Sequence, residues 1–347
     1  MFRRILVPLD GSTRAERAIP VATRLAHTSG GSVILVRVVS KSSGLWPSAA
    51  PQTILAQQVI AADRAEAEQY LSAVSTSLEL EGVPTESVVR FGSTVSTLLA
   101  VAYSSQADLI VLCSHSYTGI TRRIMGSVAE KLAREASVPV LVLREDGPMP
   151  GETHPDATHP LRALVPLDGS AHAKAALEPA AYLIAALAGS APGVLHLVRV
   201  VQPVTAGSEE GGVLTESEKA KRYLSVTADH IREGFVAPAV AKLKLAVTWS
   251  VAIDTHVAET LIREAENRAT AEGDAMLGDC DVIALATHGR DGLQRLVMGS
   301  VTERILLGTK LPLLIVLPQR RRRTARSKQA AEEEMGTGQQ VLSPTLV

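Results

Sequence analysis

The stretch that decides the fold is residues 280–318, CDVIALATHGRDGLQRLVMGSVTERILLGTKLPLLIVLP. It opens with an apolar run from Cys280 to Ala286 that includes β-branched residues, a composition typical of a buried parallel strand. The next thirteen residues, 287–299, contain three glycines, which are Gly289, Gly292 and Gly299. The sequence therefore predicts a strand that runs into a glycine-rich loop.

The remainder of this stretch predicts a helix and another strand. Ser300 and Glu303 have the S-x-x-E spacing of a capping box, so a helix is predicted to begin at Ser300, and Gly308 is placed to end it. Leu311–Leu317 is predicted to be a second buried strand. A glycine loop that leads into a helix N-terminus suits phosphate, because glycine permits close approach and the free N–H groups attract negative charge. The alternative is that Ser300 only caps its helix and the glycines only turn the chain.

The same pattern occurs a second time in the chain. Residues 107–143, ADLIVLCSHSYTGITRRIMGSVAEKLAREASVPVLVL, align without a gap with residues 280–316. The two copies share polar residues as well as apolar ones, namely His115 and His288, Gly119 and Gly292, Arg122 and Arg295, Gly126 and Gly299, Ser127 and Ser300, and Glu130 and Glu303. Core packing alone does not so readily preserve this polar set, so the repeat favours a functional loop.

Length and composition indicate two α/β domains. The 347 residues suit two domains of ordinary size, and 46% hydrophobic residues are enough to fill two cores. Aromatic residues make up only 3%, so Val, Leu, Ile and Ala must build these cores, as is usual for a parallel sheet covered by helices. A formal net charge of −1 provides no overall field to attract nucleic acid or a membrane surface.

The sequence also predicts a cytoplasmic protein. No apolar run reaches about 18 residues, so no membrane span is expected. The first residues, MFRRILVPLDGS, lack the apolar core region and the cleavage site of a signal peptide. Cys113 and Cys280 lie at opposite ends of equivalent predicted strands, so a disulfide is not expected, and a metal site would need more ligands.

The two halves begin almost identically. Residues 3–12, RRILVPLDGS, match residues 161–170, LRALVPLDGS, and each copy predicts a strand followed by Asp-Gly-Ser. Thr13 and Glu16 offer a capping box for a helix that runs through Leu25, and Ser170 is the expected cap in the second half. Further strands are predicted at 31–40, 86–91, 193–202 and 243–253, long helices at 53–80 and 215–234, loops at 41–52 and 202–213, and extra residues near 267–278.

Each half therefore predicts the order β-α-β-α-β-α-β-α-β, which implies an α/β fold with parallel strands and helices on both faces. The predicted domains are residues 1–146 and 161–318, joined by a proline-rich linker at 147–160. Residues 319–347 lack periodicity and predict a disordered tail. Its Arg cluster could contact nucleic acid or anionic lipid, but the cluster is short and lacks aromatic residues, which favours a solvated tail.

Taken together, these motifs resemble the universal stress protein family in its tandem two-domain form, over nearly all of residues 1–318. The family pattern places an Asp after the first strand and G-x2-G-x9-G-[ST] after the fourth. In the second half only the first glycine is changed, to alanine, in the motif Ala286-x2-Gly289-x9-Gly299-Ser300. In the first half both early glycines are replaced, in the motif Cys113-x2-Ser116-x9-Gly126-Ser127.

The resemblance implies two tandem doubly wound domains, each with a five-stranded parallel sheet (adenine nucleotide alpha hydrolase-like), that bind ATP at the strand C-termini. Asp168 and Asp10 would contact the adenosine part, the backbone near Val200 and Val38 would meet adenine, and the glycine motifs would hold the phosphates. The implied site in the second half is Pro166, Leu167, Asp168, Val200, Ala286, His288, Gly289, Gly299, Ser300 and Val301. In the first half it is Pro8, Leu9, Asp10, Val38, Cys113, Ser116, Gly126, Ser127 and Val128.

Several assignments within this implied site have alternatives. Asp10 and Asp168 could instead form Asx turns or N-caps. His115 and His288 lack the nucleophile and orienting partner that a general base needs, which favours a structural bond or a contact with nucleotide. Cys113 and Ser116 add side chains to the first half, so we expect the second half to bind ATP more tightly. No catalytic residue and no separate metal site is expected, and any Mg²⁺ would be carried by the nucleotide.

The favoured function is an ATP-binding regulatory protein of the general stress response with little or no turnover. The loop lacks a Walker lysine, and no clustered carboxylates indicate magnesium-dependent phosphoryl transfer. One alternative is a slow ATP hydrolase or an adenylating enzyme, although LDGSTRAE and LDGSAHAK are not pyrophosphate loops. Another is a nucleotide-free interaction scaffold. A phosphoacceptor receiver fits worse, because no acidic pair accompanies Asp10 or Asp168.

Family domains commonly pair through their last strands. The resemblance therefore implies that Val138–Leu143 and Leu311–Leu317 join the two halves as an intramolecular pseudo-dimer, and their apolar character suits a covered edge. A homodimer of whole chains and an unidentified regulatory protein partner stay open. A nucleic-acid partner is disfavoured by the charge balance.

Overall fold

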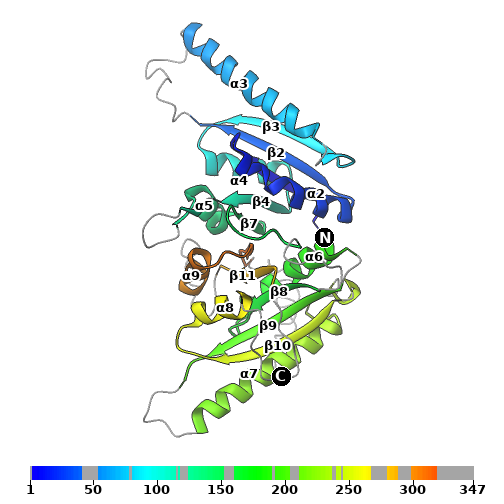
Figure 1. The fold of residues 1–347 in the computed structure, drawn as a ribbon, viewed down its shortest axis with the longest axis vertical. Coiled ribbons are helices and arrows are strands. Elements are labelled where there is room, and N and C mark those ends of the chain that lie inside the picture. Colours follow the sequence, from blue (N-terminus) through cyan, green and yellow to red (C-terminus); the bar gives the residue numbers. More distant parts are fainter. Residues whose placement is uncertain are drawn as a thin grey trace, which may run out of the picture.

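Figure 1 shows the protein as an elongated molecule in which one long sheet runs between helix α3 at one end and helix α7 at the other. This is a computed structural model, and it describes residues 2–40, 54–77, 80–114, 116–117, 124–151, 160–189, 192–203, 211–236, 240–243, 245–266, 280–287 and 298–318. Strands and helices alternate through both halves, as the hydrophobic pattern predicts.

The first half contributes five parallel strands, which are short apolar runs separated by helices. Its elements are β1 (Arg4–Leu9), α1 (Thr13–Glu16), α2 (Ala18–Ser29), β2 (Ser32–Val39), α3 (Ile54–Ser75), β3 (Thr85–Phe91), α4 (Thr94–Ser104), β4 (Leu109–Ser114), β5 (Ser116–Tyr117), β6 (Ile124–Met125), α5 (Ser127–Glu135) and β7 (Val140–Arg144). The predicted loop after β4 contains the short antiparallel pair of β5 and β6.

The second half repeats this arrangement with five more parallel strands. Its elements are β8 (Leu161–Pro166), the 3₁₀ helix η2 (Ala173–Ala176), α6 (Leu177–Ala188), β9 (Gly193–Val201), α7 (Gly211–Arg232), the 3₁₀ helix η3 (Val240–Leu243), β10 (Ala246–Ile253), α8 (Val257–Glu266), β11 (Val282–Ala286), α9 (Ser300–Gly308) and β12 (Leu313–Val316). The predicted loop at 202–213 ends early, because α7 begins at Gly211.

The ten strands form one sheet in the order β10-β9-β8-β11-β12-β7-β4-β1-β2-β3. In each half the first strand is central, with β1 between β2 and β4, and β8 between β9 and β11. The chain therefore winds outward in both directions from the first strand, and the predicted doubly wound five-stranded sheet is confirmed in both halves. The strand order reverses between β1 and β4 and between β8 and β11, where open α/β sheets usually bind ligands.

The two halves join through their last strands, as the family resemblance implied. Strand β12 pairs antiparallel with β7, with Leu314 opposite Leu141 and Ile315 opposite Val140. All four side chains are almost completely buried. Each strand would otherwise be an exposed apolar edge, so the pairing removes two surfaces prone to aggregation.

Apolar side chains cover both faces of this continuous sheet. One core cluster includes Leu141 and Leu314 together with the buried faces of α2 and α6, and it extends through both halves. The hydroxyl of Thr28 on α2 donates to the carbonyl of Ala186 on α6 over 2.9 Å, which links the halves on this face. On the other face a second cluster joins α5 and α9 around Val142 and Ile315. The halves therefore share their cores.

The helices after β4 and β11 begin where the sequence predicts, but not with the predicted caps. The N-cap residues are Gly126 and Gly299, and neither helix has a side-chain capping bond. Ser127 and Ser300 are instead the first helical residues, which places Glu130 and Glu303 one position too late for a capping box. Glu130 pairs with Arg134 over 2.7 Å. The prediction of two capping boxes was therefore wrong.

The start of the first half also differs from the prediction. Ser12, rather than Thr13, is the N-cap of α1, and its hydroxyl accepts from the Ala15 N–H over 3.2 Å. Glu16 accepts a hydrogen bond from the hydroxyl of Tyr70 over 2.8 Å instead of completing a capping box. The expected single helix is divided at Arg17 into α1 and α2, and α2 continues to Ser29.

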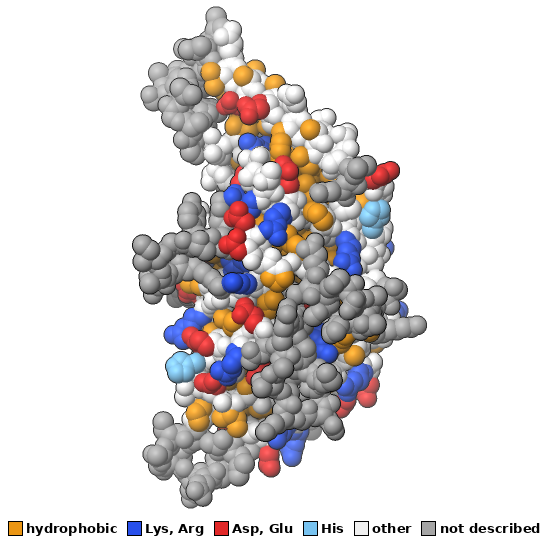
Figure 2. All heavy atoms as spheres, viewed as in Figure 1, with side chains coloured by type: hydrophobic (Ala, Val, Ile, Leu, Met, Phe, Trp, Pro, Cys, Tyr) orange, Lys and Arg blue, Asp and Glu red, His pale blue; other side chains and the backbone are white. Residues whose placement is uncertain are grey.

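Charged side chains of both signs are interspersed over the face seen in Figure 2, in keeping with a net charge of −1. Within the described ranges, no helix combines the length and apolar character needed to cross a bilayer. The predicted loop at 41–52, the extra residues near 267–278 and the tail at 319–347 lie outside the described residues, as does most of the linker.

A buried histidine distinguishes the second half. His196 on β9 is 2% exposed, and its ring nitrogens lie 2.9 Å from Thr248 Oγ1 and 3.0 Å from Ser250 Oγ on β10. Burial, together with the positive charge of Arg162, lowers the pKa of His196 to about 4. The folded protein therefore holds this ring neutral where an exposed histidine would begin to protonate.

We expect His196 to make the protein acid-sensitive. In the unfolded chain its pKa is near 6.5, so as the pH falls from about 6.5 towards 4 the unfolded state binds a proton that the folded state does not. Stability should then decline by up to roughly 3 kcal/mol from this group. Urea unfolding between pH 7.5 and 4.5 should show a smaller decline in His196→Gln. His172→Gln, which changes an exposed histidine, should keep the wild-type slope, and identical slopes in all three proteins would contradict the prediction.

Candidate functional site

The candidate sites lie at the carboxyl ends of the strands, at the two points where the strand order reverses. In the second half these ends belong to β8, β9 and β11, with the N-terminus of α9 beside them. In the first half they belong to β1, β2 and β4, with the N-terminus of α5 beside them. Loops leave the sheet on both sides of each point, so polar side chains can gather there without disrupting the core.

Asp168 follows β8 in the second half and forms an Asx turn. Its Oδ1 atom accepts from the backbone N–H of Ser170 over 2.8 Å, and the Ser170 hydroxyl accepts from the Ala173 N–H over 3.1 Å. Strand β8 ends at Pro166, and the next residue, Leu167, donates its N–H to the Val198 carbonyl over 2.8 Å. These bonds fix the backbone on either side of Asp168. They match the Asx turn that the sequence left as an alternative.

Gly299 brings the start of α9 against the end of β11. Its N–H donates to the Thr287 carbonyl over 2.8 Å, and a Cβ at this position would lie 3.3 Å from the same oxygen. The hydroxyl of Thr302 donates to the Ala286 carbonyl over 3.1 Å. The N-cap residue of α9 is Gly299, which has no side chain to accept from the first-turn N–H groups of the helix. Such an N-terminus favours an anion.

The other residues implied for the second half occupy the same end of the sheet. Pro166 ends β8, Ala286 ends β11, and Val200 is the last residue but one of β9. Ser300 and Val301 form the first turn of α9. His288 and Gly289 lie outside the described residues. The described residues that the sequence grouped are therefore brought together by the ends of three strands and one helix.

The first half brings together the corresponding residues, and its aspartate accepts three hydrogen bonds. Asp10 follows Pro8 and Leu9 of β1, and its Oδ1 accepts from the N–H of Ser12 over 3.0 Å and from its hydroxyl over 2.5 Å. Its Oδ2 accepts from Arg14 Nη2 over 2.9 Å. Partial burial raises the pKa of Asp10, but these bonds and the charges of Arg14 and Arg37 outweigh it and lower the pKa.

In each half an arginine of the second strand packs on a tyrosine of the long helix that follows it. Arg37 on β2 lies 5.5 Å from the ring centre of Tyr70, and Arg199 on β9 lies 5.3 Å from that of Tyr223. In the first half the guanidinium packs so closely on the Asp10–Ser12 turn that a Cβ at Gly11 would lie 2.6 Å from Arg37 Nη1. Gly11 also has a φ of +87°, so this turn requires glycine for two reasons.

Two residues at and after the end of β4, Cys113 and Ser116, are larger than their counterparts in the second half, Ala286 and Gly289. Cys113 occupies the position of Ala286, and the hydroxyl of Ser114 accepts from the Gly126 N–H over 3.1 Å. Ser116 lies in β5, Ser127 and Val128 begin α5, and Val38 lies near the end of β2. Both Cys113 and Cys280 are free thiols. Of the paired loop residues, His115, Gly119 and Arg122 lie outside the described residues, as do Gly292 and Arg295.

The Cys113 thiol should react slowly. Burial raises the pKa of Cys113 to about 11, and the nearby guanidinium of Arg17 offsets only part of this effect. The thiolate fraction near pH 8 should therefore be roughly 100-fold below that of an ordinary cysteine. Iodoacetamide should alkylate the native Cys280→Ala variant about 100-fold more slowly than the same variant in guanidinium chloride. Native and denatured rates within threefold of each other would contradict this.

Comparison with known proteins identifies the family to which a protein with this geometry belongs. The sequence model of the universal stress protein family matches residues 1–144 and, independently, residues 161–316. The chain belongs to the universal stress protein family. Each match contains five parallel strands and one of the two candidate sites.

Relatives of this universal stress protein occur in both one-domain and two-domain lengths. A universal stress protein of Thermus aquaticus is 28% identical over 145 residues, which is 42% of this chain and all of that protein. A universal stress protein of Mycolicibacterium smegmatis is 24% identical over 328 residues, covering 91% of this chain and 97% of that one. The crystal structure of a universal stress protein from Archaeoglobus fulgidus shares the fold, with a TM-score of 0.60, 18% identity, and coverage of 91% and 98%.

Sequence reasoning overlooked the side chains that surround Asp10. The pair of Asp10 and Arg14 has i, i+4 spacing, so the pattern could have suggested it. The contact from Arg17 to the backbone of Glu145 joins residues far apart in the sequence and has no local signal. The packing of Arg37 on Gly11 also depends on the pairing of β1 with β2.

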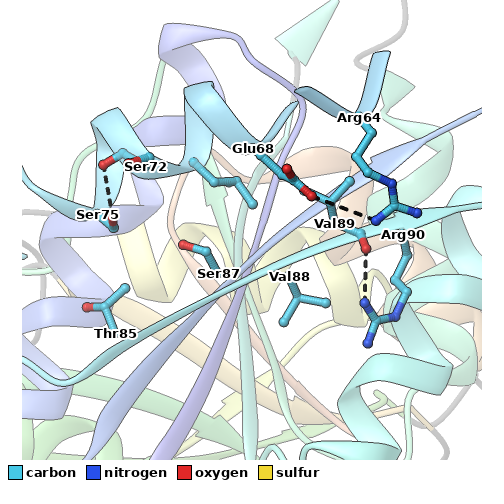
Figure 3. A pocket seen from close by; sticks show the side chains of 10 residues that line it. Arg64, Glu68, Ser72, Ser75, Thr85, Ser87, Val88, Val89 and Arg90 are labelled. Atoms are coloured by element: carbon cyan, nitrogen blue, oxygen red, sulfur yellow. Dashed lines mark hydrogen bonds and ion pairs between the residues drawn. The ribbon is translucent and has the colours of Figure 1, made fainter. Parts of the chain in front are cut away.

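Figure 3 shows a separate groove of about 490 Å³ between helix α3 and the edge strand β3 of this universal stress protein. Arg64 and Glu68 of α3 face each other across 3.7 Å, and Arg90 Nη1 donates to the Val89 carbonyl over 3.0 Å. The groove runs along the side of β3 rather than over the ends of β1 and β4. It is therefore not part of the candidate site.

Proposed function

We propose that this universal stress protein binds ATP in its second half and acts as a nucleotide-responsive regulatory protein of the stress response. The observation that supports the proposal is that Asp168 and the N-terminus of α9, whose N-cap residue is Gly299, lie at the point where the strand order reverses. A carboxylate suits ribose hydroxyls, and helix N–H groups suit phosphates, so the two ends of one nucleotide are matched.

The phosphates would lie against the first turn of α9. Gly299 has no side chain to hold an anion away, and Ser300 adds a hydroxyl to the backbone N–H groups of that turn. The helix dipole favours the negative charge at the same place. Gly289, which the family motif assigns to the phosphates, would complete the loop. In this proposal the glycine motif supplies backbone donors instead of a charged side chain.

The adenosine part would lie towards β8 and β9. The N–H of Ser170 holds one carboxylate oxygen of Asp168, which orients the group before any ligand arrives. A carboxylate accepts several hydrogen bonds, so Asp168 can keep this bond and accept from ribose as well. The backbone near Val200 would meet the adenine ring, with Pro166, Leu167, Ala286 and Val301 forming the surrounding wall.

We expect binding with little or no turnover. The described residues hold no group of three His, Cys, Asp or Glu side chains placed to share a metal ion. We expect any Mg²⁺ to be carried by the nucleotide, and no lysine follows Gly299 to act as in a Walker motif. A slow hydrolase or adenylating enzyme would instead release phosphate or pyrophosphate over time in the presence of magnesium.

Calorimetric titration of the purified protein with ATP, together with extraction of any bound nucleotide, tests the proposal. We expect close to one equivalent of ATP per chain, counting nucleotide that co-purifies. Asp168→Ala should weaken binding at least tenfold, whereas Asp108→Ala, at the other end of the strands, should not. A protein that neither contains nor binds adenine nucleotide would overturn the proposal and favour an interaction scaffold.

A further inference from the structure

The two halves differ in the crevice between their first and fourth strands. In the first half Arg14 lies across this crevice. Its side chain is only 16% exposed, and it bonds Asp10 at the end of β1 over 2.9 Å. Helix α1, which carries Arg14, packs on both β1 and β4, and Cys113 lies at the end of β4. Arg14 therefore occupies the space between the ends of two adjacent strands.

A second arginine extends the same barrier towards β7. Arg17 is half-buried, and its Nη1 donates to the backbone carbonyl of Glu145, which directly follows β7. Arg17 directly follows α1, which packs on β4, so its side chain passes the end of β4 on its way to Glu145. Together Arg14 and Arg17 reach from the end of β1 past β4 to the end of β7.

The second half has no comparable side chains at these positions. The stretch from Leu9 aligns without a gap with the stretch from Leu167, which places His172 opposite Arg14 and Ala175 opposite Arg17. The alignment also pairs Ala15 with Ala173 and Ala18 with Ala176, all of which are buried. His172 is exposed, and Ala175 has no side chain beyond Cβ. The two halves therefore bury the same alanines, although this turn is α-helical in α1 and 3₁₀ in η2, and they differ in the side chains at the strand ends.

We infer that Arg14 and Arg17 fill the nucleotide crevice of the first half and exclude adenine nucleotides from it. The inference rests on the proposed function for the position of the ligand, and it assigns the difference between the halves to two residues. The exclusion is mainly steric. The charge attraction between Arg14 and the exposed Asp10 carboxylate contributes little to this exclusion by itself. What matters is that three donors already occupy the carboxylate and that the Arg14 side chain is largely buried.

Arg37 strengthens this arrangement from the other side. It packs against the Asp10–Ser12 turn and on the ring of Tyr70, so the turn is held between β2 and α1. The hydroxyl of Tyr70 donates to Glu16, two residues beyond Arg14. Position 174, opposite Glu16, is a lysine, whose ammonium lies 5.1 Å from the ring centre of Tyr223. In the first half the Glu16 carboxylate ties α1 to α3 by accepting from Tyr70, whereas the lysine at position 174 of the second half cannot accept such a bond.

Exchanging the two pairs of residues tests the inference. In Arg14→His/Arg17→Ala the first half receives the residues of the second, and calorimetry should find one more equivalent of ATP than in the wild type. In His172→Arg/Ala175→Arg the second half receives the arginines, and its affinity for ATP should fall at least tenfold. His172→Arg alone, and melting curves for every variant, show whether a loss of binding reflects the crevice or a failure to fold.

The outcomes separate this inference from the proposed function. If the wild type binds no ATP, the proposed function fails, yet a gain of binding in Arg14→His/Arg17→Ala would still support the inference. If the wild type binds one equivalent, the inference requires both the gain and the loss. A folded His172→Arg/Ala175→Arg protein with unchanged affinity would overturn it, and so would an Arg14→His/Arg17→Ala protein that gains no site.

Discussion

Replacing Leu314 by aspartate is expected to destabilise both halves of the protein by at least about 4 kcal/mol. Leu314 is fully buried in β12, between Ala284 on one side and Leu141 of the first half on the other. A carboxylate there would lie in an apolar core with no cation beside it among the side chains of that cluster. Small domains are stable by only about 5–15 kcal/mol, so the change should remove much of the margin.

The shared sheet makes this effect extend beyond one domain. Because β7 and β12 bury each other, loss of β12 would expose the apolar edge of β7 as well. Urea unfolding followed by circular dichroism should show a lower midpoint, and hydrogen exchange should show reduced protection in both β7 and β12. Leu307→Asp is the matched control, since Leu307 on α9 is 40% exposed and should cost no more than about 0.5 kcal/mol. Equal midpoints for the two variants would contradict the prediction.

The sequence predicted the sheet well because its strongest signals are local and repeated. Apolar runs such as Leu109–Ser114 and Val282–Ala286 identify buried strands, and their near-identical surroundings in the two halves indicate the same fold twice. Alternation with helices then implies parallel strands with helices on both faces, whereas the doubly wound order came from the resemblance to a family. The antiparallel join of β7 and β12 came from the resemblance to a family, since no local pattern specifies which of two apolar edges will meet.

The errors at the helix starts have a simple physical cause. Gly-Ser-x-x-Glu contains two residues that commonly act as N-caps, and the sequence alone does not choose between them. In the structure the N–H of Gly299 bonds the carbonyl of Thr287, which sets glycine rather than serine at the cap. A contact between the helix start and the preceding strand therefore shifted the expected cap by one residue. The shift matters, because it removes the capping box, and the N–H groups of this first turn are the ones that the proposed ATP would use.

The composition of the candidate site was predictable only in part. Strand ends such as Pro166 and Ala286 had to gather at one edge once the sheet was parallel, and the motif placed Gly299 beside them. The arginines of the first half could not be placed in the same way. Arg14 and Arg17 each have several staggered rotamers along a flexible side chain, and only tertiary contacts with Asp10 and Glu145 select the one that crosses the crevice.

If Arg14 and Arg17 close the first crevice, the similar starts of α5 and α9 should contribute differently to ATP binding, and the same substitution at both N-cap glycines should show this. Gly299→Val is expected to weaken ATP binding on the order of 100-fold, or about 3 kcal/mol. A Cβ at Gly299 would lie 3.3 Å from the Thr287 carbonyl, so the loop or the helix start must shift, and the two methyl groups would project where phosphate approaches the first turn. The N–H donors of α9 would then be displaced from the anion that they are expected to hold.

Gly126→Val is the matched control, because Gly126 is the N-cap of α5 in the same motif of the first half. With Arg14 and Arg17 across that crevice, we expect its affinity for ATP to stay within about twofold of the wild type, since only the working site determines binding. Calorimetry on both variants, with melting curves to confirm folding, makes the comparison. A protein in which Gly126→Val abolishes binding while Gly299→Val leaves it intact would reverse the assignment and place the working site in the first half.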